Sequence, residues 1–142
     1  MTESTDAVLI GRALGLIDDG DIPALLGLLD PSIEWRPPKQ GTLDDAYHGH
    51  DGVQALFRQL TEAWDSFEHI PTKLVSGRDV HIVVTRLKLH AQASDVVVDE
   101  LWAYAVRIED GLFTFVAMYT DPEQALREHT SSALEGAPDW PS

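Results

Sequence analysis

The chain has 142 residues, no cysteine, and 24 acidic against 10 basic side chains, so its formal net charge is −14. This length suits one compact domain with its own hydrophobic core, because domains usually hold roughly 100–150 residues. The negative charge disfavours nucleic acid and anionic membranes as partners, since both are bound through lysine and arginine. The lack of cysteine rules out disulfides, thiolate nucleophiles and cysteine-based metal sites.

The N-terminal residues are polar and acidic, unlike a targeting signal, which is basic and then apolar. No apolar run approaches the ~18 residues that a membrane span needs. These features predict a cytoplasmic protein. The sequence contains no glycine-rich phosphate loop, nucleophile elbow or dinucleotide fingerprint, so no cofactor is expected.

The N-terminal part of the chain has the apolar spacing of helices. A first helix is predicted around Val8–Ile17 and ends at an Asp-Asp-Gly sequence. Asp21 can cap a second helix, which is expected to stop at the Asp-Pro pair that ends with Pro31. Asp51 is the expected N-cap of a third helix, whose apolar face continues to Trp64.

A short strand is predicted at Ser32–Arg36, followed by a long polar loop. The pattern then changes to β-branched and aromatic residues separated by turn signals. Four more strands are expected at residues 67–75, 80–90, 96–108 and 112–119, and a last short helix at residues 122–128. Residues 1–130 are expected to form a single domain, and residues 131–142 a C-terminal tail with Trp140 as a candidate anchor. Helices followed by antiparallel strands predict an α+β fold in which helices cover one face of a curved sheet.

The Asp110-Gly111 pair is the strongest turn signal, because a tight two-residue hairpin needs positive φ at both positions. Counting outward from this turn pairs Ile108 with Phe113 and divides the hairpin into two faces, both apolar. One face carries Trp102, Tyr104, Phe113, Phe115 and Tyr119, and the other carries Asp99, Leu101, Ala103, Val116 and Met118. The aromatic face is interpreted as a homodimer interface. Alternatively it is core, and the face with small residues points outward.

Three motifs together carry a family resemblance. They are Asp-Gly-Asp followed by Leu-Leu-Asp-Pro-Ser-Ile-Glu-Trp, then Tyr-His-Gly-His-Asp-Gly-Val, and finally Asp-Gly with Tyr-Thr-Asp-Pro further on. From about Asp6 to Glu128 the chain resembles the nuclear-transport-factor-2-like superfamily, and more narrowly its SnoaL-like or ketosteroid-isomerase-like branch. This resemblance implies a cone in which a curved sheet wraps three helices around a deep apolar pocket, with dimers formed through the outer sheet face.

The catalytic residues known in this branch are not matched. The three positions of a ketosteroid isomerase fall near Ala13, Trp35 and Ala103, none of which can act as an acid or a base. The cyclase aspartate falls near Met118. The nearest equivalent of the epoxide hydrolase Arg–Asp pair is Arg107 with Glu109, at the turn and away from any pocket. The resemblance therefore leaves open whether the chain is an enzyme.

Asp99 is the carboxylate most in phase with the face that the resemblance assigns to the pocket, so it is the candidate general base. The alternative is an ion pair with Arg86 or Lys88 on the neighbouring strand. His50 is the second candidate, as a polar group at the pocket mouth, and either His50 or Tyr47 could polarise a substrate. His48 and His50 have no third ligand at helical spacing, so no metal site is expected.

The expected pocket lining is mostly apolar: Trp35, Tyr47, Phe57, Leu60, Trp64, Leu101, Ala103, Val116 and Met118. The leading interpretation is a protein that binds a small, mostly apolar molecule. One alternative is an isomerase, cyclase or hydrolase acting on a polyketide-, terpene- or steroid-like substrate. Another is a non-catalytic dimeric interaction module. A register shift of one residue would exchange the two hairpin faces and place Trp102, Tyr104 and Tyr119 inside.

Overall fold

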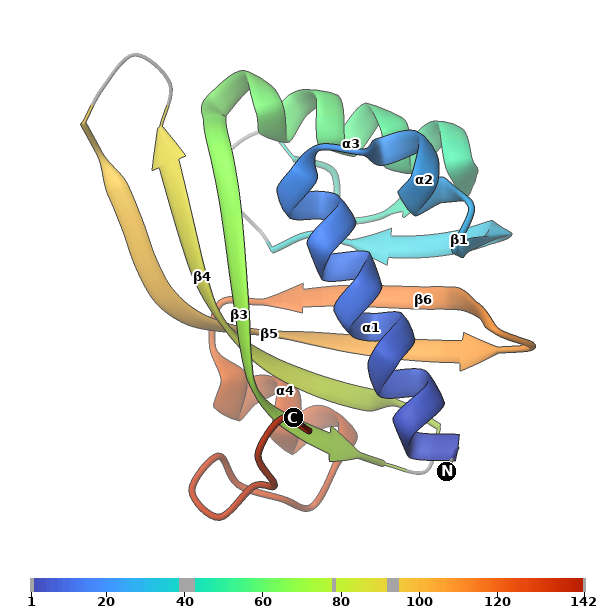
Figure 1. Cartoon of the computed structure of the whole chain (residues 1–142), viewed down its shortest axis with the longest axis vertical. Coiled ribbons are helices and arrows are strands. Elements are labelled where there is room, and N and C mark those ends of the chain that lie inside the picture. The colour runs from blue at the N-terminus through green and yellow to red at the C-terminus, as the bar shows by residue number, and fades with distance from the viewer. Residues whose placement is uncertain (1, 39–42, 78, 92–94, 142) are drawn as a thin grey trace.

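One curved sheet, with six strands in the described part of the chain, wraps around a layer of helices (Figure 1). The computed structural model describes residues 2–38, 43–77, 79–91 and 95–141. The helices are α1 (Thr2–Asp19), α2 (Ile22–Leu26), α3 (Gly49–Ala63) and α4 (Pro122–His129). The strands are β1 (Leu29–Arg36), β2 (Tyr47–His48), β3 (Trp64–Ser76), β4 (His81–Ala91), β5 (Val97–Glu109) and β6 (Leu112–Tyr119).

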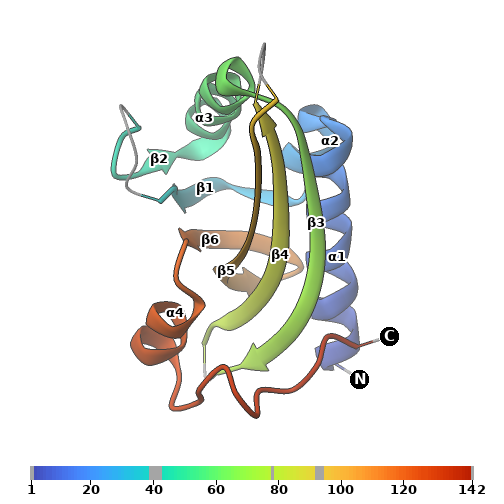
Figure 2. The same ribbon diagram turned by 90° about the vertical axis from the view of Figure 1, so that its left-hand side faces the viewer.

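The strand order is β2-β1-β6-β5-β4-β3, and all neighbours are antiparallel except β1 and β6. Helices α1, α2 and α3 lie on the concave side of the sheet, and α4 lies on the convex side (Figure 2). This arrangement confirms the predicted α+β fold with a curved, mainly antiparallel sheet around three N-terminal helices. No helix in the described ranges combines the length and the hydropathy of a membrane span.

The first two helices follow their local signals only in part. Gly20 ends α1 with a φ of 72°, and the Asp21 side chain accepts a hydrogen bond from the backbone N–H of Ala24 at 3.2 Å. However, α2 is shorter than predicted, and β1 begins at Leu29. The Phe113 backbone N–H donates to the Leu28 carbonyl at 2.9 Å, so pairing with β6 extends β1 toward its N-terminus. A tertiary contact thus overrides the helical spacing of the leucines.

The start and the end of α3 also differ from the prediction. His48 occupies the N-cap position without a side-chain hydrogen bond, and Asp51 lies in the first turn. Trp64 is extended and begins β3. The two-residue strand β2 was not predicted, and it pairs with β1 through Glu34 and His48. A strand of two residues is too short to show the alternation of apolar and polar residues by which strands are predicted.

The tight turn between β5 and β6 forms as predicted, with φ values of 53° at Asp110 and 79° at Gly111. Ile108 pairs with Phe113, also as predicted, but Arg107 pairs with Phe115. Thr114 is therefore an extra residue in β6, and its hydroxyl donates to the Arg107 carbonyl at 3.4 Å. Such a β-bulge reverses the side to which the following side chains point.

The predicted register is wrong beyond this bulge. Tyr104 pairs with Met118, and Ala103 pairs with Tyr119. The five residues assigned to one aromatic interface therefore lie on two sides of the sheet. Trp102, Tyr104 and Phe113 are buried on the concave side, while Phe115 and Tyr119 pack on the convex side.

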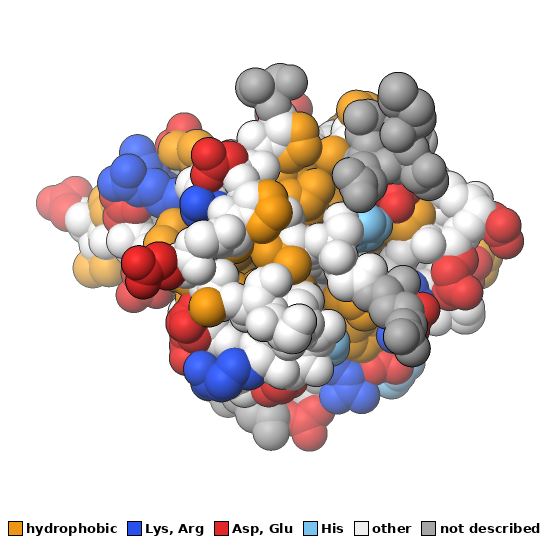
Figure 3. Space-filling view, turned by 90° about the horizontal axis from the view of Figure 1, so that it is seen from below, with side chains coloured by type: hydrophobic (Ala, Val, Ile, Leu, Met, Phe, Trp, Pro, Cys, Tyr) orange, Lys and Arg blue, Asp and Glu red, His pale blue; other side chains and the backbone are white. Residues whose placement is uncertain are grey.

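The convex side is partly covered by the chain itself. Ala125 and Leu126 of α4 are fully buried against the small side chains Ala103 and Ala105. The small side chains on the convex side thus make room for a helix. Seen from below, hydrophobic side chains lie in the middle of the molecule and acidic ones around its edge (Figure 3).

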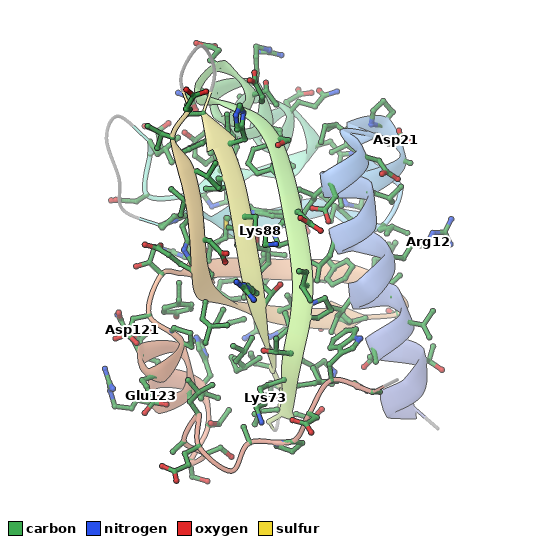
Figure 4. The ribbon with its side chains drawn as sticks, turned by 60° about the vertical axis from the view of Figure 1, so that its left-hand side comes forward. Arg12, Asp21, Lys73, Lys88, Asp121 and Glu123 are labelled. Atoms are coloured by element: carbon green, nitrogen blue, oxygen red, sulfur yellow. The ribbon has the colours of Figure 1, made fainter. Side chains whose placement is uncertain are left out.

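The C-terminal tail continues from α4 around the edge strand β3 (Figure 2). The Leu74 N–H donates to the Pro138 carbonyl at 3.0 Å, and the Trp140 N–H donates to the Thr72 carbonyl at 2.9 Å. Lys73, labelled in Figure 4, forms an ion pair with Asp139 at 2.8 Å. These contacts occupy the part of the edge strand around Lys73 and block pairing of that part with another chain.

We expect Leu126→Ala to lower the free energy of unfolding by about 2–5 kcal/mol, because it leaves a cavity under α4. Arg127→Ala is the matched control, since this exposed neighbour changes stability by less than about 1 kcal/mol. Urea titration monitored by circular dichroism measures both. Equal losses in the two variants would show that α4 does not dock through Leu126.

Candidate functional site

A pocket opens between the concave face of the sheet, helices α1 and α3, and the residues Pro38 and Leu43. Its walls are mostly aromatic and aliphatic. The lining residues are Ile17, Pro38, Leu43, Phe57, Leu60, Trp64, Phe67, His69, Leu87, Leu89, Trp102, Tyr104 and Met118. His69 and Tyr104 are the only titratable side chains in this lining, so any acid–base chemistry inside the described pocket depends on them.

The pocket is narrow in this conformation. The space between its walls is about 480 Å³ when the open mouth is included, but only about 30 Å³ admits the centre of a water molecule. The smaller value limits the size of a bound ligand, and it corresponds to one or two water molecules. A larger molecule therefore needs some lining side chains to move.

Asp18, His69 and Tyr104 form a chain of hydrogen bonds at the pocket wall. Asp18 lies in the last turn of α1, His69 on the edge strand β3, and Tyr104 on the central strand β5. The His69 Nδ1 atom lies 2.6 Å from Asp18 Oδ1, and its Nε2 atom lies 2.6 Å from the Tyr104 hydroxyl oxygen. The other Asp18 oxygen, Oδ2, accepts the backbone N–H of His69 at 2.9 Å. Both carboxylate oxygens of Asp18 thus form hydrogen bonds with His69.

These partners assign the proton positions. A carboxylate can only accept, so His69 Nδ1 carries the hydrogen. In a neutral imidazole, Nε2 then accepts the hydroxyl hydrogen of Tyr104. The two rings meet edge to face, with centroids 5.5 Å apart and planes at 84°. This is the order of groups found in relays that pass a proton from a hydroxyl to an imidazole oriented by a carboxylate.

Burial sets the electrostatics of the chain. The His69 side chain is 1% exposed and that of Asp18 is 22% exposed. Desolvation, together with the negative charge of Asp18, raises the pKa of Tyr104 far above its ordinary range. The Tyr104 hydroxyl is therefore protonated at neutral pH. It can give up its proton only when another proton replaces it.

Several predicted lining residues do meet in this region. Phe57, Leu60, Trp64 and Met118 line the pocket. Trp35 and Val116 instead line a second, smaller cavity beside it. The Trp35 Nε1–H donates to the Met118 sulfur at 3.3 Å, so a residue lining the cavity contacts a residue lining the pocket.

Three other predicted lining residues lie elsewhere. Ala103 is buried on the convex side under α4, and Leu101 is 43% exposed there. Tyr47 is buried, but its hydroxyl donates to Gln59 Oε1 and accepts the Asp44 backbone N–H. Leu101 and Ala103 were placed by counting across the bulge at Thr114, which explains their error.

Asp99 and His50 do not join the pocket. Arg86 donates two hydrogen bonds to the Asp99 carboxylate, at 2.7 and 2.8 Å, on the convex side of the sheet. These bonds lower the pKa of Asp99 below its ordinary value. The pairing with Arg86, which the sequence offered as the alternative, is the one present. His50 Nε2 lies 3.0 Å from the Leu29 carbonyl oxygen, so the imidazole helps to hold β1.

Asp18, His69 and Tyr104 were not predicted to form a site. Asp18 was treated as part of a helix end, and Tyr104 as part of an outer interface. A weak signal for His69 existed, since it has the same strand phase as Phe67 and thus falls on an apolar face. The described residues contain no group of three or more side chains placed to hold a metal ion.

Comparison with known proteins places the chain in a family. The model of the SnoaL-like domain matches residues 10–116. A search among curated proteins finds no match. An NTF2-like protein of unknown function from Burkholderia pseudomallei superposes with a TM-score of 0.74 at 18% identity, covering 89% of this chain and 98% of that one.

Two further solved structures have the same fold. TerC, co-crystallised with polyporic acid, has a TM-score of 0.74 at 18% identity and covers 90% of this chain and 99% of its own. A candidate SnoaL-like polyketide cyclase from a Jannaschia species has a TM-score of 0.70 at 15% identity, covering 91% and 94%. The domain match over residues 10–116 shows that the chain belongs to the SnoaL-like family, and the solved structures share its fold, a cone of sheet and helices.

Proposed function

We propose that the chain binds a small, mostly apolar molecule in this pocket and exchanges a proton with it through Tyr104, His69 and Asp18. The observation that carries this proposal is the hydrogen-bonded chain of these three residues, whose inner end lines an otherwise apolar pocket. An apolar pocket with few convergent polar groups is the usual form of a small-molecule site. Asp99 is replaced as the candidate base, because it lies outside the pocket.

The relay works without a free phenolate. As the Tyr104 oxygen accepts a proton from the substrate, its own proton passes to His69 Nε2. The imidazolium that forms is stabilised by the Asp18 carboxylate at Nδ1, 2.6 Å away. The reverse movement returns a proton to another atom of the same substrate. A proton removed from one position and added at another gives an isomerisation, or the enolisation that precedes a ring closure.

The lining favours a flat ring system with one polar group. Phe57, Trp64, Phe67 and Trp102 supply aromatic walls, and the polar group would meet the Tyr104 hydroxyl. Met118 is flexible and unbranched, so its movement can widen the narrow space. Among the reactions that the family resemblance implies, isomerase or cyclase chemistry on a polyketide-, terpene- or steroid-like ketone fits a single proton relay best. Hydrolysis would also need a group that activates water.

We expect the protein to accelerate deuterium exchange at the C1 position of 2-tetralone, an enolisable aromatic ketone, in D2O. Tyr104→Phe removes the hydroxyl that meets the substrate, so the exchange rate should fall about 100-fold or more. Nuclear magnetic resonance measures the loss of the C1 proton signal.

Tyr119→Phe is the matched control. Tyr119 also contacts a histidine edge to face, with its hydroxyl 2.9 Å from His129 Nε2, but on the convex side of the sheet. Its removal should leave the exchange rate unchanged. If Tyr104→Phe exchanges at the wild-type rate, the relay is refuted. If the wild type binds 2-tetralone without accelerating exchange, the pocket is a binding site alone.

Asp18→Asn should lower the free energy of unfolding by about 1–2 kcal/mol, because an uncharged amide accepts a weaker hydrogen bond from His69 than a carboxylate does. Asp19→Asn changes the exposed neighbour and serves as the control, with an expected effect below about 0.5 kcal/mol. Urea unfolding gives both values. A loss of the slowly exchanging Nδ1 proton signal of His69 in the Asp18 variant alone would locate the effect at this contact.

We also propose a homodimer, through a different surface from the aromatic face that the sequence indicated, because Trp102 and Tyr104 of that face are buried on the concave side. The part of the convex side that α4 leaves open carries Val97 and Leu101, which are 59% and 43% exposed, beside the Arg86–Asp99 ion pair. A second copy could bury these side chains and match the paired charges.

Sedimentation velocity at micromolar concentration tests the dimer. If two copies associate there, Leu101→Lys should give a monomer. Val8→Lys should not, because Val8 is exposed on α1, on the other side of the sheet. A monomeric wild type would overturn the dimer proposal and leave the pocket proposal unaffected.

A further inference from the structure

A second cavity lies behind Tyr104, deeper between α1 and the concave face of the sheet. Its lining residues are Ile10, Ala13, Leu14, Ile17, Leu25, Leu29, Trp35, Val83, Tyr104, Val106, Phe113 and Val116. Ile17 and Tyr104 also line the pocket described above. These two side chains therefore form the partition between the two spaces.

The two sides of the partition differ in chemistry. Toward the pocket, the Tyr104 hydroxyl and His69 provide polar atoms. The described lining of the cavity is apolar throughout, so Tyr104 contributes ring carbon there. The cavity leaves about 20 Å³ for the centre of a water molecule. Because a water there would have no hydrogen-bond partner among the described lining, the space stays dry.

A dry gap in a core lowers stability, because the atoms around it lose dispersion contacts. This gap directly adjoins the residue that meets the substrate. It is covered by α1, whose Arg12 points away from the sheet toward solvent (Figure 4). Its size suits a few carbon atoms and excludes a second ring.

We propose that the cavity is a subsite for a short alkyl branch of the substrate, which passes the edge of Tyr104 at Ile17. This inference rests on the proposed function, since it takes the pocket as the place of the ring and Tyr104 as the group beside its polar atom. The substrate is then an aromatic or alicyclic ketone that bears a short aliphatic chain next to the carbonyl. The cavity would discriminate substrates by the length of that chain.

A series of alkyl phenyl ketones tests the subsite: acetophenone, propiophenone, butyrophenone, valerophenone and hexanophenone. Quenching of the fluorescence of Trp64 and Trp102, which line the pocket, reports binding. In the wild type, Kd should fall about fourfold for each methylene that enters apolar surroundings. The decrease should stop after the first two or three added carbons, when the cavity is full.

Val83 and Val84 offer a matched pair of positions for variants. They are neighbours on β4, and both are fully buried. Val83 lines the cavity, whereas Val84 faces the convex side and α4. Val83→Ile fills part of the cavity and should stop the decrease in Kd at a shorter ketone. Val83→Ala should extend it to a longer one. Val84→Ile and Val84→Ala should keep the wild-type dependence on chain length.

The outcomes separate this inference from the proposed function. If acetophenone binds and every longer ketone binds equally well, the cavity is only a packing gap and the subsite is overturned. The same holds if the Val83 variants retain the wild-type profile. If no ketone of the series binds to the folded wild type, the pocket proposal fails together with the subsite. Circular dichroism of each variant before the titrations shows whether it is folded. If either Val83→Ile or Val83→Ala fails to fold, the other variant still tests the subsite.

Discussion

The hydrogen bonds of His69 hold together the elements that form the candidate site. A histidine that is 1% exposed has two ring nitrogens that need partners, since an unpaired buried polar atom is costly. Asp18 satisfies one and Tyr104 the other. These bonds connect the end of α1, the edge strand β3 and the central strand β5. The same contacts that close α1 over the sheet therefore also aim the only titratable groups of the described pocket lining into its interior.

The bulge at Thr114 decides what this interior contains. One extra residue in β6 brings Val116 and Met118 to the same side of the sheet as Phe113. Tyr104 of β5, which pairs with Met118, lies on this side too. The extra residue also turns Ala117 to the convex side, where it lies in one cluster with Ala103 and Ala105 of β5. A helix can approach a sheet closely where side chains are small, and Ala125 and Leu126 of α4 pack on this group of alanines. The tail then covers the part of the edge strand β3 around Lys73.

The sequence predicted the fold well where local signals agree with tertiary structure. The long periodic segments predicted α1, α3 and the four long strands at nearly their observed places, and the Asp110-Gly111 pair predicted the turn between β5 and β6. The exception among the N-terminal helices is α2, which is shorter than predicted. Family resemblance supplied the cone, and the domain match at residues 10–116 supports it. The boundaries that failed are those set by contacts across the chain: β1 begins early because Leu29 pairs with Phe113, and Trp64 leaves α3 because it starts the long strand β3.

The site was predicted only in its apolar part. Phe57, Leu60, Trp64 and Met118 were identified because hydrophobic spacing along a helix or strand shows which face is buried. The polar part depends on three residues separated by 51 and 35 positions, and no local pattern brings Asp18, His69 and Tyr104 together. Composition and periodicity determined that this chain has a buried apolar face and an acidic exterior. Only the folded sheet decided which side chains meet in the pocket. The bulge in β6 changes the side to which the following side chains point, and a shift of one residue moves every side chain to the opposite face.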